Sequence, residues 1–321
     1  MSAAVDRGGA VRTDGVAGVD GATGAAATSS GVRRLRLLTP ASLVELTAAL
    51  SAVTAQSRFL AGGTDLVRSM QQDHWIPDLI VDLGDVAELH GIQATADDLR
   101  IGAATTFTDI ASDPLVGRHA TCLARAAAVV GSRQTRNMAT IGGNIGNASP
   151  CGDSLAPLLA LEARGVVLDS GGATCERPVA EILAGPGRTT LRHDEIITEL
   201  VLPLLGDDWH STYAKLGSRT MVSVARVGMA VVVRLDAAAE TIVEARVGIG
   251  ALGLTAFRAE GLEQVLTGSR VNQSTRDAFV AACPDVARQS IPGRYSLPYK
   301  QEAIRGVAWD AWEDLGLESV R

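Results

Sequence analysis

A stretch rich in glycine and asparagine, TIGGNIGNASPCGD at residues 140–153, constrains the fold of this chain more than any other feature. It follows an Ala- and Val-rich segment, residues 119–130, that predicts a buried helix ending at Gly131. The stretch offers backbone N–H groups, hydroxyls, amides and one carboxylate, Asp153, which can accept a hydrogen bond from a ribose hydroxyl. The pattern favours a ligand-binding loop at 132–152, with Asp153 as the cap of the next helix.

A second glycine segment, FLAGGTDL at residues 59–66, has the pattern of a strand that runs into Gly62-Gly63 and then into a helix. Without Cβ atoms such a turn can bring its backbone N–H groups close to an anion, and the helix N-terminus adds a favourable dipole. The geometry suits a pyrophosphate. An ordinary tight turn capped by Thr64 accounts for the same residues equally well, because short glycine motifs often occur by chance.

A third glycine pattern, from Gly248 to Gly253, fits the dinucleotide-binding sequence G-x-G-x-x-G, but its context argues against that function. The fingerprint normally opens a βαβ unit that continues into further parallel strands, whereas the remainder of this chain is mostly helical in pattern. We therefore predict that this segment is a strand end and a turn that pack closely within a second domain.

The hydrophobic pattern changes near residues 203–210, and this change predicts a domain boundary. Residues 1–31 are poor in bulky apolar side chains and predict a disordered tail. Residues 32–206 alternate short strands and helices, whereas residues 207–321 begin with long β-branched segments and end in helices. In the first domain we expect a helix near 43–53, strands near 58–61, 79–83, 99–103, 165–169 and 195–202, and a helix capped by Thr106. In the second we expect strands at 211–216, 223–235 and 241–250 and helices near 258–267, 274–282 and 298–315.

Composition excludes several classes of function. The formal net charge of −7 gives no cationic surface for nucleic acid or anionic lipid, and no run of apolar residues is long enough to span a membrane. The N-terminus lacks the layout of a secretory signal, so we expect a cytoplasmic protein. The four cysteines lie far apart and the five histidines have no metal-ligand spacing, so any iron or zinc is expected on a partner.

Two segments together, FLAGGTDLV at 59–67 and QTRNMATIGGNIGNASPCGDSLAPLLALEA at 134–163, closely resemble the flavin-binding segments of the FAD subunits of molybdenum hydroxylases. This group includes the medium subunit of aerobic carbon monoxide dehydrogenase and the FAD subunit of xanthine dehydrogenase. Further similarity runs through DEIITELVLP at 194–203 and YAKLGSR at 213–219. The resemblance covers nearly all of residues 33–318.

The resemblance implies an α+β fold. A two-part α/β FAD-binding domain of the PCMH (vanillyl-alcohol-oxidase-like) type precedes a smaller C-terminal domain of antiparallel sheet and helices. It implies that Asp153 binds the adenosine ribose and that Ile197 and Lys215 lie beside the flavin. The residues that would hold the pyrophosphate and ribityl groups, largely by backbone donors, are Ala61, Gly62, Gly63, Thr64, Asp65, Thr140, Gly142, Gly143 and Asn144. In some relatives an aromatic residue stands where this chain has Val129-Val130, so the residue that covers the ring is left open.

The implied function is electron relay rather than catalysis by residues of this chain. FAD, bound non-covalently, would take electrons from [2Fe–2S] clusters on a small subunit and pass them to NAD⁺, a quinone or another acceptor. The molybdenum cofactor would reside on a large subunit, in a dimer of heterotrimers. No catalytic acid–base pair is expected here. Two alternatives stay open: a free-standing FAD-dependent reductase, which needs its own proton donor, and a flavin-binding module without turnover.

Overall fold

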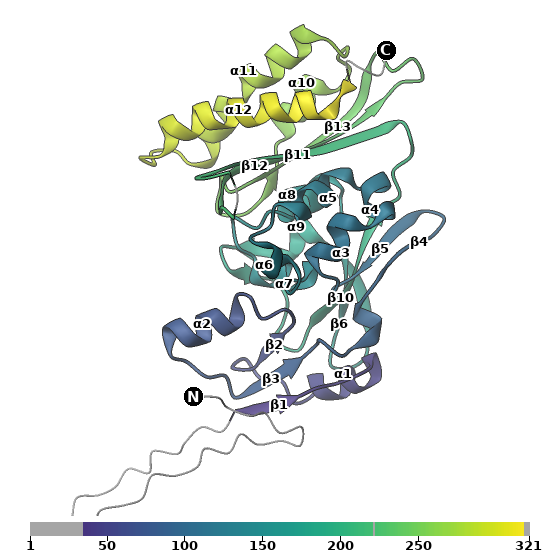
Figure 1. Cartoon of the computed structure of the whole chain (residues 1–321), viewed down its shortest axis with the longest axis vertical. Coiled ribbons are helices and arrows are strands. Elements are labelled where there is room, and N and C mark those ends of the chain that lie inside the picture. Colours follow the sequence, from purple (N-terminus) through teal and green to yellow (C-terminus); the bar gives the residue numbers. More distant parts are fainter. Residues whose placement is uncertain (1–34, 221, 318–321) are drawn as a thin grey trace, which may run out of the picture.

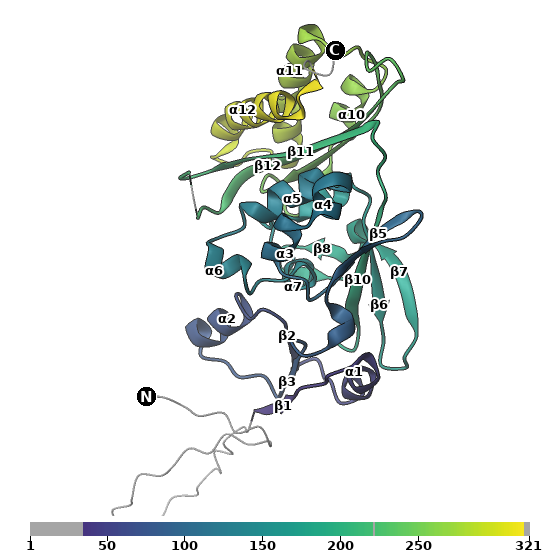
Figure 2. The ribbon, with the colours of Figure 1, turned by 45° about the vertical axis from the view of Figure 1, so that its right-hand side comes forward.

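A computed structural model describes residues 35–220 and 222–317, and the tail predicted at 1–31 lies outside these residues. The described chain is elongated, with three tiers stacked along its longest axis (Figure 1). The first two tiers are built from residues up to Pro203, and the third begins at Trp209. Figure 2 shows the same three tiers from a second direction.

The first tier is a small parallel sheet. Its strands β1 (Arg36–Leu38), β3 (Leu79–Asp82) and β2 (Arg58–Leu60) lie in that order. Helix α1 (Leu43–Leu50) begins at Ser42, whose hydroxyl accepts a hydrogen bond from the backbone N–H of Glu45 at 3.3 Å. Its buried Leu46 and Leu50 pack on Leu79 and Val81, as the predicted apolar face requires. Helix α2 (Leu66–Asp73) follows β2 and buries none of its residues.

The second tier is an antiparallel sheet with helices on one side. Its strand order is β4 (Ile92–Ala94), β5 (Asp98–Gly102), β10 (Ile196–Pro203), β6 (Arg164–Leu168) and β7 (Thr174–Pro178). Its remaining elements are η1 (Ala87–Leu89), α3 (Phe107–Ser112), α4 (Pro114–His119), α5 (Thr121–Ala128), α6 (Arg133–Arg136), α7 (Ile141–Asn147), α8 (Leu155–Ala160), α9 (Val179–Ile182), β8 (Leu183–Gly185) and β9 (Arg188–Thr189). Thr106 caps α3, as predicted, by accepting from the N–H of Asp109.

The third tier is an antiparallel sheet buried on both faces. Its strands are β11 (Trp209–Gly217), β12 (Ala225–Leu235), β13 (Ile242–Gly250) and β14 (Phe257–Arg258), and its helices are α10 (Glu260–Leu266), α11 (Gln273–Ser290) and α12 (Leu297–Leu315). Along β12, Ala230 and Val232 join the core of the second tier, whereas Met229, Val231 and Val233 pack under the three helices. The helices cover the outer face, and α5 and α8 cover the inner face (Figure 1). The expected α+β architecture is confirmed.

Three sequence predictions about these elements are wrong. Residues 132–152 are not one loop, because they contain α6 and α7. Helix α7 forms despite its glycines because Ile141 and Ile145 are buried and Thr140 caps it. Asp153 does not cap the next helix: α8 begins at Leu155 after Ser154, without a side-chain cap. In addition, α11 runs on past the expected end near residue 282, through Pro284, to Ser290.

Candidate functional site

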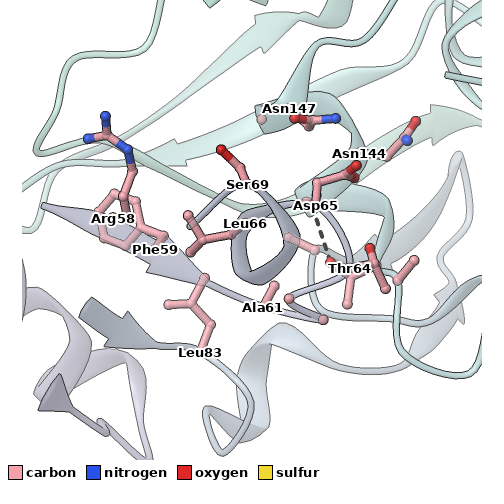
Figure 3. Close-up of a pocket in the computed structure, with 18 of the residues that line it drawn as sticks. Arg58, Phe59, Ala61, Thr64, Asp65, Leu66, Ser69, Leu83, Asn144 and Asn147 are labelled. Carbon is pink, nitrogen blue, oxygen red and sulfur yellow. Dashed lines mark hydrogen bonds between the residues drawn. The ribbon is translucent and has the colours of Figure 1, made fainter. Parts of the chain in front are cut away.

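A cavity of about 640 Å³ lies between the first and second tiers, and the first two glycine segments line it. Figure 3 shows Thr64 and Asp65 on one wall, Asn144 and Asn147 on another, and Arg58 and Phe59 farther along the cleft. The volume lies within the usual range for a small-molecule site. Of the residues named from the sequence, the cavity is lined by Ala61, Gly62, Gly63, Thr64, Asp65, Thr140, Gly142, Gly143, Asn144 and Ile197.

The first segment needs its two glycines for different reasons. A Cβ atom on Gly62 would lie 1.7 Å from the carbonyl oxygen of Met138, so this glycine lets the turn after β2 touch the backbone that leads into the second segment. Gly63 has φ +67°, a left-handed conformation that other residues adopt only with strain. The glycine pair therefore fixes both the contact between the two segments and the shape of the turn.

The turn after β2 presents free donors to the cavity. Among residues 35–220 and 222–317, no protein atom accepts a hydrogen bond from the backbone N–H of Gly62, Gly63, Thr64 or Asp65. All four residues line the cavity and precede α2, whose dipole is positive at this end. Unpaired N–H groups that face a cleft are suited to bind an anion such as a pyrophosphate.

The second segment presents side chains instead of backbone donors. The N–H of Gly142 donates to the carbonyl of Ala103 at 2.8 Å, and the N–H of Gly143 donates to the Thr140 hydroxyl at 3.1 Å. Asn144 and Asn147 project from α7 into the cavity. The carbonyl oxygen of the Asn144 side chain accepts from Ser154 at 2.8 Å, which leaves its amide N–H groups to donate. The N–H groups of Gly142 and Gly143 are therefore occupied within the protein, and backbone donors remain available for a ligand at the first segment.

The inner wall of the cleft is apolar apart from one carboxylate. Ile197 is 4% exposed on β10 and lines the cavity, as do the apolar residues Ala103 and Leu83. Glu195, also 4% exposed, forms ion pairs with Arg177 and with Arg192, the latter at 3.0 Å, and accepts from the backbone N–H of Arg192 at 2.8 Å. Burial opposes ionisation of this carboxyl, but these hydrogen bonds outweigh it and hold the pKa of Glu195 below its usual value.

Asp153 and Lys215 lie together, away from the lining of this cavity. The Asp153 carboxylate is 8% exposed and accepts from the Tyr213 hydroxyl at 2.9 Å and from Lys215 Nζ at 2.7 Å. Lys215 Nζ also donates to the carbonyl of Val129 at 3.2 Å. Burial raises the pKa of Asp153, against the opposing effect of the Lys215 charge, and holds the pKa of Tyr213 well above its usual value. This cluster joins the third tier to the second.

The cavity has lining residues that sequence reasoning missed. Asn147 belongs to the second glycine segment, so the same sequence pattern could have predicted it. Trp75 and Arg58 had no such signal: the Arg58 guanidinium lies 5.2 Å from the centre of the Trp75 ring, and Trp75 Nε1 donates to the Ser69 hydroxyl on α2. Their proximity depends on how α2 folds back over β2.

The third glycine pattern is the predicted strand end and turn. Gly248 and Gly250 are in β13, which pairs with the antiparallel strands β12 and β14. A Cβ atom on Gly248 would lie 2.1 Å from the carbonyl oxygen of Ala156 on α8, whereas one on Gly250 would meet only the Ala156 side chain, at 3.6 Å. This segment faces another helix, not a cavity. In the described ranges, no three His, Cys, Asp or Glu side chains gather as a metal site, and no helix is long and apolar enough to cross a membrane.

Comparison with known families gives two matches that together span most of the chain. Residues 33–205 match the model described as the FAD binding domain in molybdopterin dehydrogenase. Residues 212–315 match the model described as the CO dehydrogenase flavoprotein C-terminal domain.

Individual proteins agree with these matches. The chain is 32% identical over 252 residues to the nicotinate dehydrogenase FAD-subunit of Eubacterium barkeri, covering 77% of this chain and 84% of that protein. It is 31% identical over 248 residues to the carbon monoxide dehydrogenase medium chain of Hydrogenophaga pseudoflava, covering 76% and 85%. A solved structure of the carbon monoxide dehydrogenase from that organism superposes with a TM-score of 0.78 at 28% identity, covering 86% of this chain and 95% of that one.

Proposed function

Because this chain belongs to the family of FAD-binding subunits of molybdenum-dependent dehydrogenases, we propose that it relays electrons through FAD within a larger enzyme. The electrons would come from [2Fe–2S] clusters on a partner and leave to NAD⁺, a quinone or another acceptor. When bound, FAD supplies the ability to take up electrons one at a time and release them in pairs. The single observation that carries this proposal is the cleft with four free backbone donors at the glycine turn.

The residues around the cleft fit a dinucleotide cofactor. We propose that the N–H groups of residues 62–65 hold the pyrophosphate and that the Asn144 amide donates to the adjoining sugar chain. Ile197 would form part of the apolar wall against a ring. Lys215 would lie beside the flavin, next to Val129, and its ion-pair partner Asp153 would lie behind it. Since both Asp153 oxygens already have partners, its proposed effect on the cofactor passes through Lys215.

The chemistry of the cleft supports a relay more than a reaction on an organic substrate. A free-standing reductase needs a proton donor beside its substrate. The buried acid of this cleft, Glu195, is paired with two arginines and has a lowered pKa, so it stays ionised near neutral pH. We therefore assign no catalytic residue to this chain, and the protein's contribution is to bind and orient FAD.

The proposed assembly contains a large molybdenum-cofactor subunit and a small subunit with two [2Fe–2S] clusters, as a dimer of heterotrimers. Support comes from the carbon monoxide dehydrogenase medium chains among the relatives. Within this chain we propose a FAD-binding domain at 32–206 and a second domain at 207–321. In support, the second-tier sheet ends at Pro203 and the third-tier sheet begins at Trp209.

Purification tests the proposal directly. The native protein should purify with molybdenum- and iron-containing subunits, and denaturation should release unmodified FAD. The isolated chain should bind FAD but hydroxylate no substrate. If the isolated chain turned over an organic substrate at a useful rate without molybdenum or iron, a free-standing reductase would replace the relay. A chain that bound no FAD under any condition would end both readings.

A further inference from the structure

Exposed basic and aromatic side chains from three segments gather at the end of the third-tier sheet where β12 begins. The basic–aromatic surface, as we define it, comprises Val224, Arg226, Leu254, Arg294, Tyr295 and Tyr299. The Arg226 guanidinium lies 6.0 Å from the centre of the Tyr299 ring, which brings the start of β12 next to the first turn of α12. Val224 is 70% exposed, Leu254 62% and Tyr295 fully exposed.

The positive charges of this surface have no acidic partner. In the part of the chain that the structure describes, neither Arg226, Arg294 nor the neighbouring Lys300 forms an ion pair. By contrast, Arg125 on α5 pairs with Asp314 on α12 at 2.7 Å. Burial lowers the pKa of Lys300, and the charges of Arg294 and Arg226 lower it further, so the three cations share one neighbourhood. A cluster of unpaired cations is notable on a chain whose formal net charge is −7.

The side chains of this surface are those that dominate protein interfaces. Tyrosine and arginine are enriched among the residues that carry binding energy, and they act best around an apolar centre. Here the exposed Tyr295 and Tyr299 belong to one surface with the exposed Val224 and Leu254, and Arg226 lies over the Tyr299 ring. Such a surface fits a partner with an apolar centre and carboxylates at its rim.

This surface adjoins the Asp153–Lys215 cluster. Lys215 on β11 pairs with Gly228 on β12, two residues after Arg226. Lys300 Nζ donates to the carbonyl of Ala251 at 2.5 Å, and the N–H of Ala251 donates to the carbonyl of Pro150 at 2.9 Å, close to Asp153. In Figures 1 and 2 the α11–α12 turn, the end of β11 and the start of β12 lie on the same side of the molecule as α6 and α2.

We propose that the basic–aromatic surface docks a carboxylate-bearing face of the iron–sulfur subunit. This inference rests on the proposed function, in which Lys215 lies beside the flavin and the iron–sulfur subunit, as electron donor, must approach that edge closely. The unpaired arginines steer and align that partner, and the tyrosines provide its buried contact.

The test compares charge reversal at the two ends of β12 in the FAD-loaded full chain. The double variant Arg226→Glu/Arg294→Glu should raise the Kd for the remaining purified subunits by roughly 10- to 100-fold and reduce the salt dependence of binding. Tyr295→Ser should weaken binding by about fivefold or more. The matched control is Arg270→Glu, which should leave the Kd unchanged. Arg270 is exposed and forms a β-bridge with Thr241 beside the far end of β12, roughly 30 Å from Arg226. FAD content and melting temperature should stay unchanged in all variants.

Two results would overturn the docking site while leaving the relay intact. One is that the double variant binds the molybdenum- and iron-containing subunits with the same Kd and the same salt dependence as the unmodified chain. The other is that the unmodified chain alone forms dimers whereas the double variant is monomeric, because the surface would then join two copies of this chain. If native purification yields no metal-containing partner at all, it is the proposed function that fails, and this inference fails with it.

Discussion

The glycine segment after β2 and the glycine segment at the end of β13 look alike in sequence but differ in what they touch. In both, one glycine allows a close backbone contact: Gly62 against Met138, and Gly248 against Ala156. Beside Gly62, however, four N–H groups remain free at the edge of a cavity, whereas Gly248 is paired within a sheet and closed by α8. A required glycine shows that another backbone segment packs against it. Whether a ligand can also bind there depends on whether neighbouring N–H groups are free.

The largest expected effect is on stability, at the buried Asp153–Lys215 pair, which joins the third tier to the second as Gly248 does. Lys215→Met leaves a buried carboxylate without its cation and should lower the free energy of unfolding by about 3–5 kcal/mol at pH 8. Unfolding of the FAD-free protein in urea measures this loss. A Lys215→Met protein whose FAD-free stability equals that of the unmodified chain would show that the pair does not hold the third tier to the second.

The same variant should show a pH dependence of defined sign. Burial already raises the pKa of Asp153, and removing Lys215 raises it further. A carboxyl whose pKa is higher in the folded state favours the folded state below the unfolded pKa and loses this contribution as pH rises through the folded pKa. The stability deficit of Lys215→Met should therefore shrink between pH 8 and pH 5. Asp153→Asn/Lys215→Met is the control, because its deficit should not change over this range.

The next effect separates the two close-contact glycines. Gly62→Ala should push the first segment away from Met138 and lower FAD affinity by roughly 100-fold, the equivalent of a typical overpacking cost. Gly248→Ala should lower the free energy of unfolding by about 1–3 kcal/mol while each folded molecule keeps its FAD. Flavin content after gel filtration and urea unfolding distinguish the two. A Gly248→Ala protein of normal stability that lost FAD would restore the dinucleotide fingerprint.

The smallest effects concern the second glycine of each segment. Gly63→Ala places a Cβ atom at φ +67° and should cost about 1 kcal/mol, with a several-fold loss of FAD affinity. Gly250→Ala meets only the Ala156 side chain at 3.6 Å and should change neither quantity measurably. Titration of both FAD-free proteins with FAD provides the measurement, and equal affinities would show that the left-handed turn does not shape the site.

Sequence reasoning predicted most of the fold because hydrophobic period and glycine position decide it locally. The β-branched runs of residues 223–235 and 241–250 became β12 and β13, and Thr106 caps α3. It failed where tertiary contacts override local preference. The glycine-rich residues 141–147 form a helix because Ile141 and Ile145 are buried, and Asp153 is drawn from the helix cap to Lys215, 62 residues along the chain.

The candidate site was predictable in part for the same reason. Most of the residues chosen from the two glycine segments line one cavity, since each segment keeps its own residues together. Which donors stay free was not predictable, because the N–H of Gly142 donates to the carbonyl of Ala103, a residue after β5 that is distant in sequence. The Arg58–Trp75 contact likewise depends on how α2 folds back.

Hydrogen exchange of backbone amides, measured with and without FAD, tests the central claim most directly. The N–H groups of Gly62, Gly63, Thr64 and Asp65 have no protein acceptor, so they should exchange rapidly in the FAD-free protein and become strongly protected when FAD is bound. Amides of residues 248–253 should exchange at nearly the same rate in both forms. Protection that appeared at 248–253 and not at 62–65 would contradict the account and place the cofactor on the other glycine segment.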